Sequence, residues 1–505
     1  MALFPLAASA ATATTTWTGA SSTAWALAGN WTGAAIPANQ NLLCTFNGAA
    51  ANGNRTINIA ATARNSGGAR FDSSGASGDG FTFTTATANI ALRICIDGIV
   101  NNDLDAQEYR VPIQFNSTGG TAANALTAPI NATAGSLNFN TAAFASGTTL
   151  SALNSDGAGA VFAFNAGSGN TITIGAAGTP GIISGNTGTG TRITMAGLGS
   201  LVLNGTSANT YSGGTTINAG SVTANKPNAL GTGALAANGG ILSIGANNQT
   251  VGAVTVAGGT INGTSGILTG TSYGLQNGTV NARLGGTAAL TQTTGGTTTL
   301  GGANTYSGNT TITAGTLALG ASGSIANSPI IILGGGTFDV SAVAGGFSLG
   351  ASQILRGNGN ITGSMTANGT ISPGASIGTI ISSGGLTLAG TANTIMEINH
   401  SASPQNADLF SAASITLGGT LTISDIGSGG FLAGDAYNLF DGTLSSAFSS
   451  INGLPTLDPS MAWDSSGIAS GGDGVLRIVS VPEPSTIACF GLGILALFIA
   501  RRRDV

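Results

Sequence analysis

The feature that most constrains the fold is a strand–turn unit that occurs twice along the chain. Range 295–320 reads GGTTTLGGANTYSGNTTITAGTLALG, and range 201–223 reads LVLNGTSANTYSGGTTINAGSVT. The copies align on Asn-Thr-Tyr-Ser-Gly, so Tyr211 corresponds to Tyr306. Short alternating runs of β-branched residues cut by Gly and Asn predict strands and tight turns, and the frequent Gly and Thr disfavour a long helix. One such unit cannot bury its apolar face alone, so the copies must stack on neighbours.

The composition agrees with stacked strands and argues against two other architectures. Of the 505 residues, 83 are glycine, 13 are proline, 42% are hydrophobic and 6% are charged. A disordered chain would be less hydrophobic and more charged, and collagen would need a strict Gly-X-Y period with abundant proline. The sequence therefore predicts an all-β solenoid whose coils take roughly 20–25 residues each.

The repeated unit resembles the autotransporter-associated β-strand repeat. Residues Asn304 to Leu317 match the core of that repeat, and Asn209 to Val222 match it with Gly214 and Val222 as variants. The resemblance implies a right-handed parallel β-helix that is exported and associated with the cell surface.

A second distinctive stretch closes the chain. Range 480–505 reads SVPEPSTIACFGLGILALFIARRRDV, with an apolar run from Thr486 to Ala500 followed by three arginines. As a helix, this run would be about 22 Å long, near the lower limit for a bilayer core of about 30 Å. Positive residues stay on the cytoplasmic side. We therefore expect a short C-terminal transmembrane helix, and a plain single-span anchor is the alternative.

This tail resembles the PEP-CTERM sorting signal of Gram-negative bacteria. The resemblance implies recognition by an exosortase, transient anchoring in the inner membrane, and transfer toward the cell surface, exopolysaccharide and biofilm matrix. A third possibility is a surface protein whose tail is not cleaved and keeps it in the membrane. It differs from the exosortase-sorted protein in processing alone. The residues that match the signal are Val481, Pro482, Glu483, Pro484, Arg501, Arg502 and Arg503.

The chain divides into five predicted parts. Residues 1–13 resemble part of a signal peptide, with small-x-small cleavage candidates at positions 8–10 and 11–13. Residues 14–120 form an N-terminal cap with the first coils, where Trp17, Trp25 and Trp31 are expected to cover the open end. The alternative for these tryptophans is that their rings stack on sugars. Residues 121–389 form the β-helix with both repeats. Residues 390–479 form a β-rich closing module with Trp463 in its core, and residues 480–505 form the sorting signal.

The charges and catalytic motifs argue against several function classes. The net charge is −5 without a basic stripe, which argues against nucleic acid as a partner. Three G-x-S-x-G strings centre on Ser272, Ser348 and Ser376, but a nucleophile elbow needs a following helix and a histidine base. The one histidine, His400, lies in a polar turn and is predicted to be solvated. We find no cofactor or metal fingerprint and predict a protein that is not an enzyme.

An acidic cluster leaves one alternative open. Asp97, Asp103, Asp105 and Glu108 lie close together in the sequence. Paired acids can serve a hydrolase or lyase, whereas a solvated turn explains the same residues without chemistry.

The three cysteines are Cys44, Cys95 and Cys489, and no pair has the C-x-x-C spacing of a zinc site. Cys44 and Cys95 are the candidate disulfide pair in an oxidising compartment. Pairing requires Cα atoms within about 7 Å, which the sequence leaves open.

These observations favour an exported, non-enzymatic structural or adhesive protein of the cell surface or extracellular matrix. The alternative is a carbohydrate-binding or polysaccharide-degrading β-helix protein. The alternative would require several acids and aromatics to converge in one groove.

Overall fold

The computed structural model describes residues 13–16, 42–47, 56–59, 64–72, 81–85, 92–102, 107–109, 113–115, 127–134, 136–139, 151–155, 160–176, 178–184, 190–401 and 406–481. The predicted signal peptide up to residue 12, the three tryptophans of the predicted cap and the tail from residue 482 lie outside these residues. The chain forms two compact units, one made of 1–290 with 297–307 and the other of 291–296 with 308–505. The predicted boundaries at residues 120, 389 and 479 stay predictions.

Almost all regular structure in the described residues is β. The one helical element among them is the short 3-10 helix η3 (Ser466–Ile468). The all-β prediction is therefore confirmed. In the part of the chain that the structure describes, no helix is both long and apolar enough to cross a membrane. The predicted C-terminal helix lies in the tail outside that part.

The first unit begins with the strands β1 (Ala13–Thr16), β2 (Leu42–Asn47), β3 (Thr56–Ile59), β4 (Arg64–Asp72), β5 (Thr82–Thr85), β6 (Leu92–Asn102), β7 (Gln107–Tyr109), β8 (Ile113–Phe115), β9 (Thr127–Ala132), β10 (Leu137–Phe139), β11 (Ser151–Ser155), β12 (Val161–Ala166) and β13 (Thr171–Ile174). It continues with β14 (Ile182–Ile183), β15 (Arg192–Met195), β16 (Ser200–Leu203), β17 (Gly214–Ile217), β18 (Ser221–Ala224), β19 (Leu235–Ala237), β20 (Ile241–Ser243), β21 (Gln249–Thr250), β22 (Ala253–Asn262), β23 (Ile267–Thr269), β24 (Ser272–Val280), β25 (Arg283–Gly285) and β27 (Thr297–Leu300). Strand β26 (Leu290–Gln292) lies at the division between the units.

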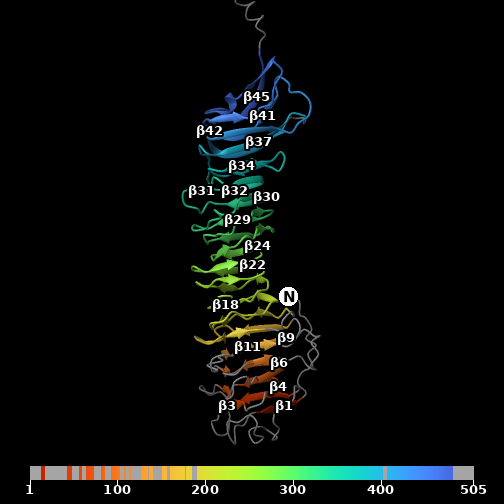
Figure 1. The fold of residues 1–505 in the computed structure, drawn as a ribbon, viewed down its shortest axis with the longest axis vertical. Helices are drawn as coiled ribbons and strands as arrows, with labels where there is room; N and C mark the ends of the chain where they lie inside the picture. The colour runs from red at the N-terminus through yellow and green to blue at the C-terminus, as the bar shows by residue number, and fades with distance from the viewer. Residues whose placement is uncertain are drawn as a thin grey trace, which may run out of the picture. The chain divides into compact units, whose positions relative to one another are not determined.

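Strands of the first unit pair in parallel with the strand one coil further along the chain. Figure 1 shows β18, β22 and β24 in this order along the ladder. Alternate residues point inward, so one column of paired and buried residues runs through the coils: Ile172, Leu201, Val222, Leu242, Ile261, Val280 and Leu300. Burying each such side chain contributes about 1.5–3 kcal/mol. The column explains why isolated coils cannot be stable, because each residue is covered by the coils on either side.

The coils of the first unit have lengths near the lower end of the predicted range of roughly 20–25 residues. Side-chain amides of equivalent asparagines hydrogen-bond from coil to coil at sequence separations of 19 to 21 residues. The pairs are Asn225 with Asn204, Asn238 with Asn218 and Asn281 with Asn262, at 2.8 to 2.9 Å. Asparagine therefore does more than form corners, because its amide also links neighbouring coils.

The N-terminal coils of this unit contain a stack of aromatic rings. Tyr109 lies between Phe83 and Phe139, with ring centroids 4.6 and 5.1 Å away and nearly parallel planes. The three residues occupy equivalent positions of the paired strands β5, β7 and β10. Parallel pairing in register places like residues face to face, so the rings stack along the ladder.

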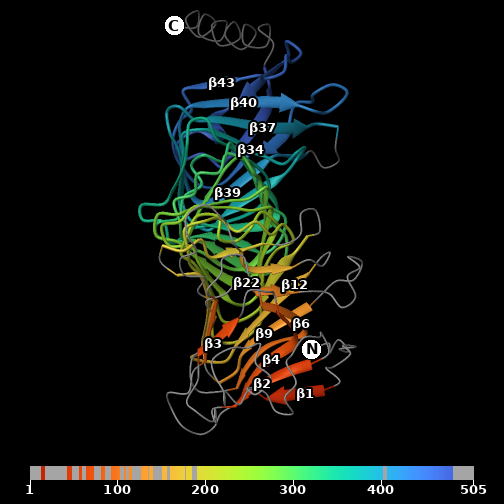
Figure 2. The same ribbon diagram turned by 60° about the horizontal axis from the view of Figure 1, so that its bottom comes forward.

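The second unit contains β28 (Thr310–Ile312), β29 (Thr316–Leu319), β30 (Ile330–Asp339), β31 (Phe347–Leu349), β32 (Ile354–Thr362), β33 (Met365–Ala367), β34 (Thr370–Pro373), β35 (Thr379–Ser382), β36 (Leu386–Leu388), β37 (Asn393–Asn399), β38 (Asn406–Ala407), β39 (Leu409–Leu417), β40 (Thr420–Asp425), β41 (Ala436–Asn438), β42 (Phe440–Ser446), β43 (Ser450–Asn452), β44 (Met461–Asp464) and β45 (Val475–Ser480). Its ladder is parallel as well, and Figure 2 shows β34, β37, β40 and β43 one after another.

The pairing changes at the C-terminal end of this unit. Strands β41, β45 and β44 form a separate antiparallel sheet with β45 in the centre. Trp463, on β44, is half-buried, so its predicted place in the core was wrong. Its indole packs against Phe431 and the buried Tyr437, and its Nε1 donates to the carbonyl oxygen of Pro455 at 2.9 Å.

Candidate functional site

The asparagine of the repeated Asn-Thr-Tyr-Ser-Gly has the same task in both copies. Asn209 accepts a hydrogen bond from the Ile183 backbone N–H through Oδ1, and Asn304 accepts one from the Leu284 N–H, each at 2.9 Å. Both asparagines are buried, and each thus satisfies a backbone donor of an earlier coil. The predicted equivalence of Tyr211 and Tyr306 also holds, since both are buried.

A buried lysine that the sequence analysis did not single out follows the first copy closely. Lys226 is the one lysine of the chain. Its side chain is buried, and its Nζ donates to the carbonyl oxygen of Gly181 at 2.5 Å and to Oδ1 of Asn209 at 2.9 Å. Gly181, Asn209 and Lys226 lie on three successive coils, so the ammonium group ties these coils together.

Burial lowers the pKa of Lys226 from 10.5 to about 8. The unfolded chain therefore binds a proton at this amine more tightly than the folded chain does. Its contribution to stability increases as the pH rises from about 8 to about 10.5. The reason is that burying the charged ammonium group costs free energy, and this cost disappears once the folded amine is neutral in alkaline solution.

In the second unit, a buried carboxylate likewise joins segments that are distant in sequence. Asp408, between β38 and β39, is fully buried and accepts backbone N–H donors from Gly378 and Glu397, each at 2.8 Å. Gly378 lies in the turn between β34 and β35, thirty residues before Asp408. Burial raises the pKa of Asp408 from 3.8 to about 7, the two hydrogen bonds oppose this, and the charge of Glu397 adds to it.

This carboxylate gives a testable pH dependence. The folded chain holds the Asp408 proton more tightly than the unfolded chain, so this residue's contribution to stability falls as the pH rises from about 4 to about 7. In Asp408→Asn, the amide NH₂ must face a backbone N–H, which costs about 1–3 kcal/mol at pH 4. At pH 8 the variant lacks the buried charge, and its deficit should shrink. Urea unfolding of wild type and variant at both pH values measures the difference. An equal deficit at both would contradict the assignment.

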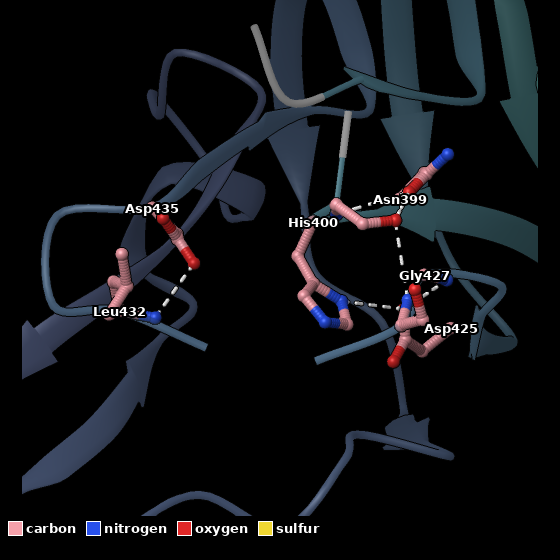
Figure 3. Close-up of polar contacts among 8 residues, drawn as sticks. Asn399, His400, Asp425, Gly427, Leu432 and Asp435 are labelled. Atoms are coloured by element: carbon pink, nitrogen blue, oxygen red, sulfur yellow. Dashed lines mark hydrogen bonds and ion pairs between the residues drawn. The ribbon is translucent and has the colours of Figure 1, made fainter. Parts of the chain in front are cut away.

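The sole histidine lies in a cluster at the C-terminal end of this unit. Figure 3 shows the His400 ring pointing toward Asp425, whose Oδ1 lies 3.0 Å from Nδ1 and also accepts the Gly427 N–H at 2.9 Å. The His400 side chain is 4% exposed. The prediction of a solvated histidine was therefore wrong, because the loop after β40 folds back over the turn that follows β37.

Aromatic rings cover the other side of this histidine. The ring of Phe431 lies 4.2 Å from the ring of His400, and Trp463 packs edge-on against Phe431 at 5.5 Å. The ring centroids of Tyr437 and Trp463 are 6.2 Å apart. Burial, together with the charges of Asp435 and Asp425, raises the pKa of the Tyr437 phenol. In the same loop, Asp435 accepts the Leu432 N–H at 2.9 Å (Figure 3).

The chemistry that this cluster can perform is restricted. His400 Nε2 is buried and has no hydrogen-bond partner among the described residues, whereas Nδ1 lies 3.0 Å from Asp425 Oδ1. Within the same part of the chain, no group of three or more His, Cys, Asp or Glu could hold a metal ion. The contact between His400 and Asp425 joins the turn after β37 to the end of β40.

The serines of the G-x-S-x-G strings lie in β structure. Ser272 begins β24, Ser348 is in β31, and Ser376 lies in the turn between β34 and β35. Each is followed by strand or turn rather than by the helix of a nucleophile elbow.

For several predicted site residues the structure describes the backbone but not the side chain, and others lie outside the described residues. Cys44 is in β2 and Cys95 in β6, with β4 paired to both strands. Their side chains lie outside the described residues, so the disulfide stays a prediction. The same holds for the side chains of the acidic cluster, Asp97, Asp103, Asp105 and Glu108.

Of the predicted sorting residues, the structure describes Val481. It directly follows β45, and its N–H donates to the carbonyl oxygen of Ser460 at 2.7 Å. The other six, Pro482, Glu483, Pro484, Arg501, Arg502 and Arg503, lie outside the described residues.

Comparison with protein families identifies both sequence signals. Residues 480–503 match the PEP-CTERM protein-sorting motif, and residues 193–224 and 290–319 match the passenger-associated-transport repeat. The two resemblances drawn from the sequence are confirmed. The sorting motif implies an exported protein that is sorted by an exosortase. No curated protein matches the chain.

Proposed function

We propose that this chain is a non-enzymatic structural or adhesive protein, which an exosortase separates from its C-terminal tail and delivers to the cell surface or extracellular matrix. The observation that carries the proposal is the sorting motif at 480–503, which begins where the last strand of the folded body ends. A folded body followed immediately by a sorting tail suits a protein that is delivered whole.

The proposal includes the finer architecture. Both units are right-handed parallel β-helices, and residues 486–500 are a short helix that holds the chain in the inner membrane until processing. The parallel ladders and their buried apolar columns support the first part. The 15-residue apolar run followed by three arginines supports the second.

The matrix partner in this proposal is exopolysaccharide. Only 6% of the residues are charged, and amide groups lie exposed in the Asn204–Asn225 and Asn218–Asn238 pairs. Such groups hydrogen-bond to sugar hydroxyls without the salt sensitivity of ion pairs. The polysaccharide-degrading alternative depends on Asp103 and Asp105, outside the described residues, and stays a prediction.

The sorting motif provides the direct test. We expect wild-type protein, expressed in a Gram-negative host that has an exosortase, to reach the outside as a shortened chain. The triple variant Pro482→Ala, Glu483→Ala and Pro484→Ala should stay at full length in the inner-membrane fraction. Cell fractionation with intact-mass measurement distinguishes the two.

Two controls make this test specific. Pro459→Ala changes an exposed loop proline outside the motif and should be processed like wild type. Deletion of the exosortase should reproduce the triple variant. Release of the triple variant at the wild-type rate would refute the proposed sorting route.

A further inference from the structure

The last strand of the folded body continues into the sorting motif. The motif match begins at Ser480, and β45 ends at the same residue. Ser480 pairs with Met461 of β44, and Val481 donates its N–H to the Ser460 carbonyl oxygen at 2.7 Å. The first residue of the motif is therefore the last residue of a strand, the second is hydrogen-bonded to Ser460, and Pro482 follows directly.

The hydrogen bonds and burial that fix β45 in its sheet decrease after Ile478. Ile478 is 1% exposed, donates its N–H to the Asp435 carbonyl oxygen at 2.9 Å, and accepts the Gly434 N–H at 2.8 Å. It also pairs with Trp463 on the opposite side. Ile478 is thus fixed by backbone hydrogen bonds on one side, by pairing with β44 on the other, and by burial of its side chain.

The next three residues are held on one side alone. Val479 and Val481 are 40% and 43% exposed, and Ser480 is exposed as well. The pairing of β41 with β45 ends at the Ala436–Arg477 pair, whereas β44 continues to pair with Val479 and Ser480. Their detachment loses a few backbone hydrogen bonds and little apolar burial, so it is the least costly opening of this sheet.

Enzymes that cut or transfer peptide chains bind several residues around the reacting bond as an extended strand. Residues before Pro482 cannot enter such a cleft while β44 occupies one of their backbone edges. We propose that Val479–Val481 detach from β44 when the exosortase binds, and that Ile478 is the fixed point at which the folded body ends during processing. The inference rests on the proposed function.

A cross-strand disulfide tests the detachment. Because Ser460 and Val481 are a hydrogen-bonded pair, the neighbouring pair Met461–Ser480 is non-hydrogen-bonded and has the closer Cα atoms, which suits a disulfide. The double variant Met461→Cys with Ser480→Cys, oxidised in the periplasm, should be processed at least about tenfold more slowly than wild type. Added reductant should restore processing, which excludes misfolding as the cause.

A second disulfide in the same sheet is the matched control. The pair Asn438–Val475 is also non-hydrogen-bonded, because the Ile478 N–H bonds to Asp435 three positions away in the register. Asn438→Cys with Val475→Cys fixes β45 on the body side of Ile478 and should leave processing unchanged. Normal processing of the Met461–Ser480 disulfide variant would overturn this inference, whereas a wild-type chain that stays uncut would overturn the proposed function itself.

Discussion

Replacing Gly315 with alanine is expected to lower the free energy of unfolding of the second unit by about 2–4 kcal/mol. Gly315 has φ +63°, a left-handed conformation that an L-residue adopts at a cost. An added Cβ would lie 2.1 Å from the Thr294 carbonyl oxygen and 2.3 Å from that of Gly296. The latter oxygen accepts the Thr316 N–H, so the clash cannot be relieved without loss of a coil-to-coil hydrogen bond.

Gly220 occupies the equivalent position of the first repeat and provides an independent check. Its φ is +62°, and its Cβ would meet the carbonyl oxygens of Gly197 and Gly199. Because Gly220 lies in the first unit and Gly315 in the second, each variant should shift the urea midpoint of its own unit. Gly295→Ala is the control, since an added Cβ there contacts nothing within 4 Å. Equal midpoints for Gly315→Ala and Gly295→Ala would contradict the explanation.

The second large effect concerns the chemical reactivity of Lys226. In the folded protein, an amine-reactive ester should acylate Lys226 on the order of 10²–10³-fold more slowly than an exposed lysine, because reaction requires local opening of the coils. The buried Nζ remains bonded to Gly181 and Asn209 until then. Peptide mapping after timed labelling, in buffer and in denaturant, measures the protection.

An internal reference sharpens this measurement. Arg192 is exposed on β15, so Arg192→Lys introduces a solvent-accessible amine in the same chain. Labelling at that position should follow the rate of a free lysine, while Lys226 stays protected until denaturant is added. Equal labelling rates at the two positions in native buffer would show that Lys226 is not buried in solution.

The sequence was sufficient to predict the parts of the fold that depend on local pattern. Alternation and Gly/Asn corners indicated the strands and the coil length, and the repeated Asn-Thr-Tyr-Ser-Gly correctly equated Tyr211 with Tyr306. The repeat match nevertheless begins at residue 193 rather than 201. Strand β15 (Arg192–Met195) was not included because it lies before the stretch in which the two copies align, although Ile193 pairs in register with Thr215.

The polar interactions were harder to predict because they join residues distant in sequence. Asp408 binds Gly378 thirty residues earlier, and Lys226 reaches Gly181 over forty-five. His400 appeared solvated because its immediate neighbours are polar, whereas Asp425 and Phe431 cover it from another coil and loop. The one feature of the sequence that indicated a special environment for Lys226 was its rarity, because it is the single lysine of a chain of low charge.

The inward column from Leu201 through Val222, Leu242 and Ile261 has a consequence for how such a chain can change over generations. Each position sees the same surroundings as the one before it, so duplication or deletion of one complete coil, about 20 residues, leaves every remaining contact with an equivalent substitute. A single inserted residue inside a strand instead turns all following apolar side chains toward water. The length of this ladder can therefore evolve in whole-coil steps.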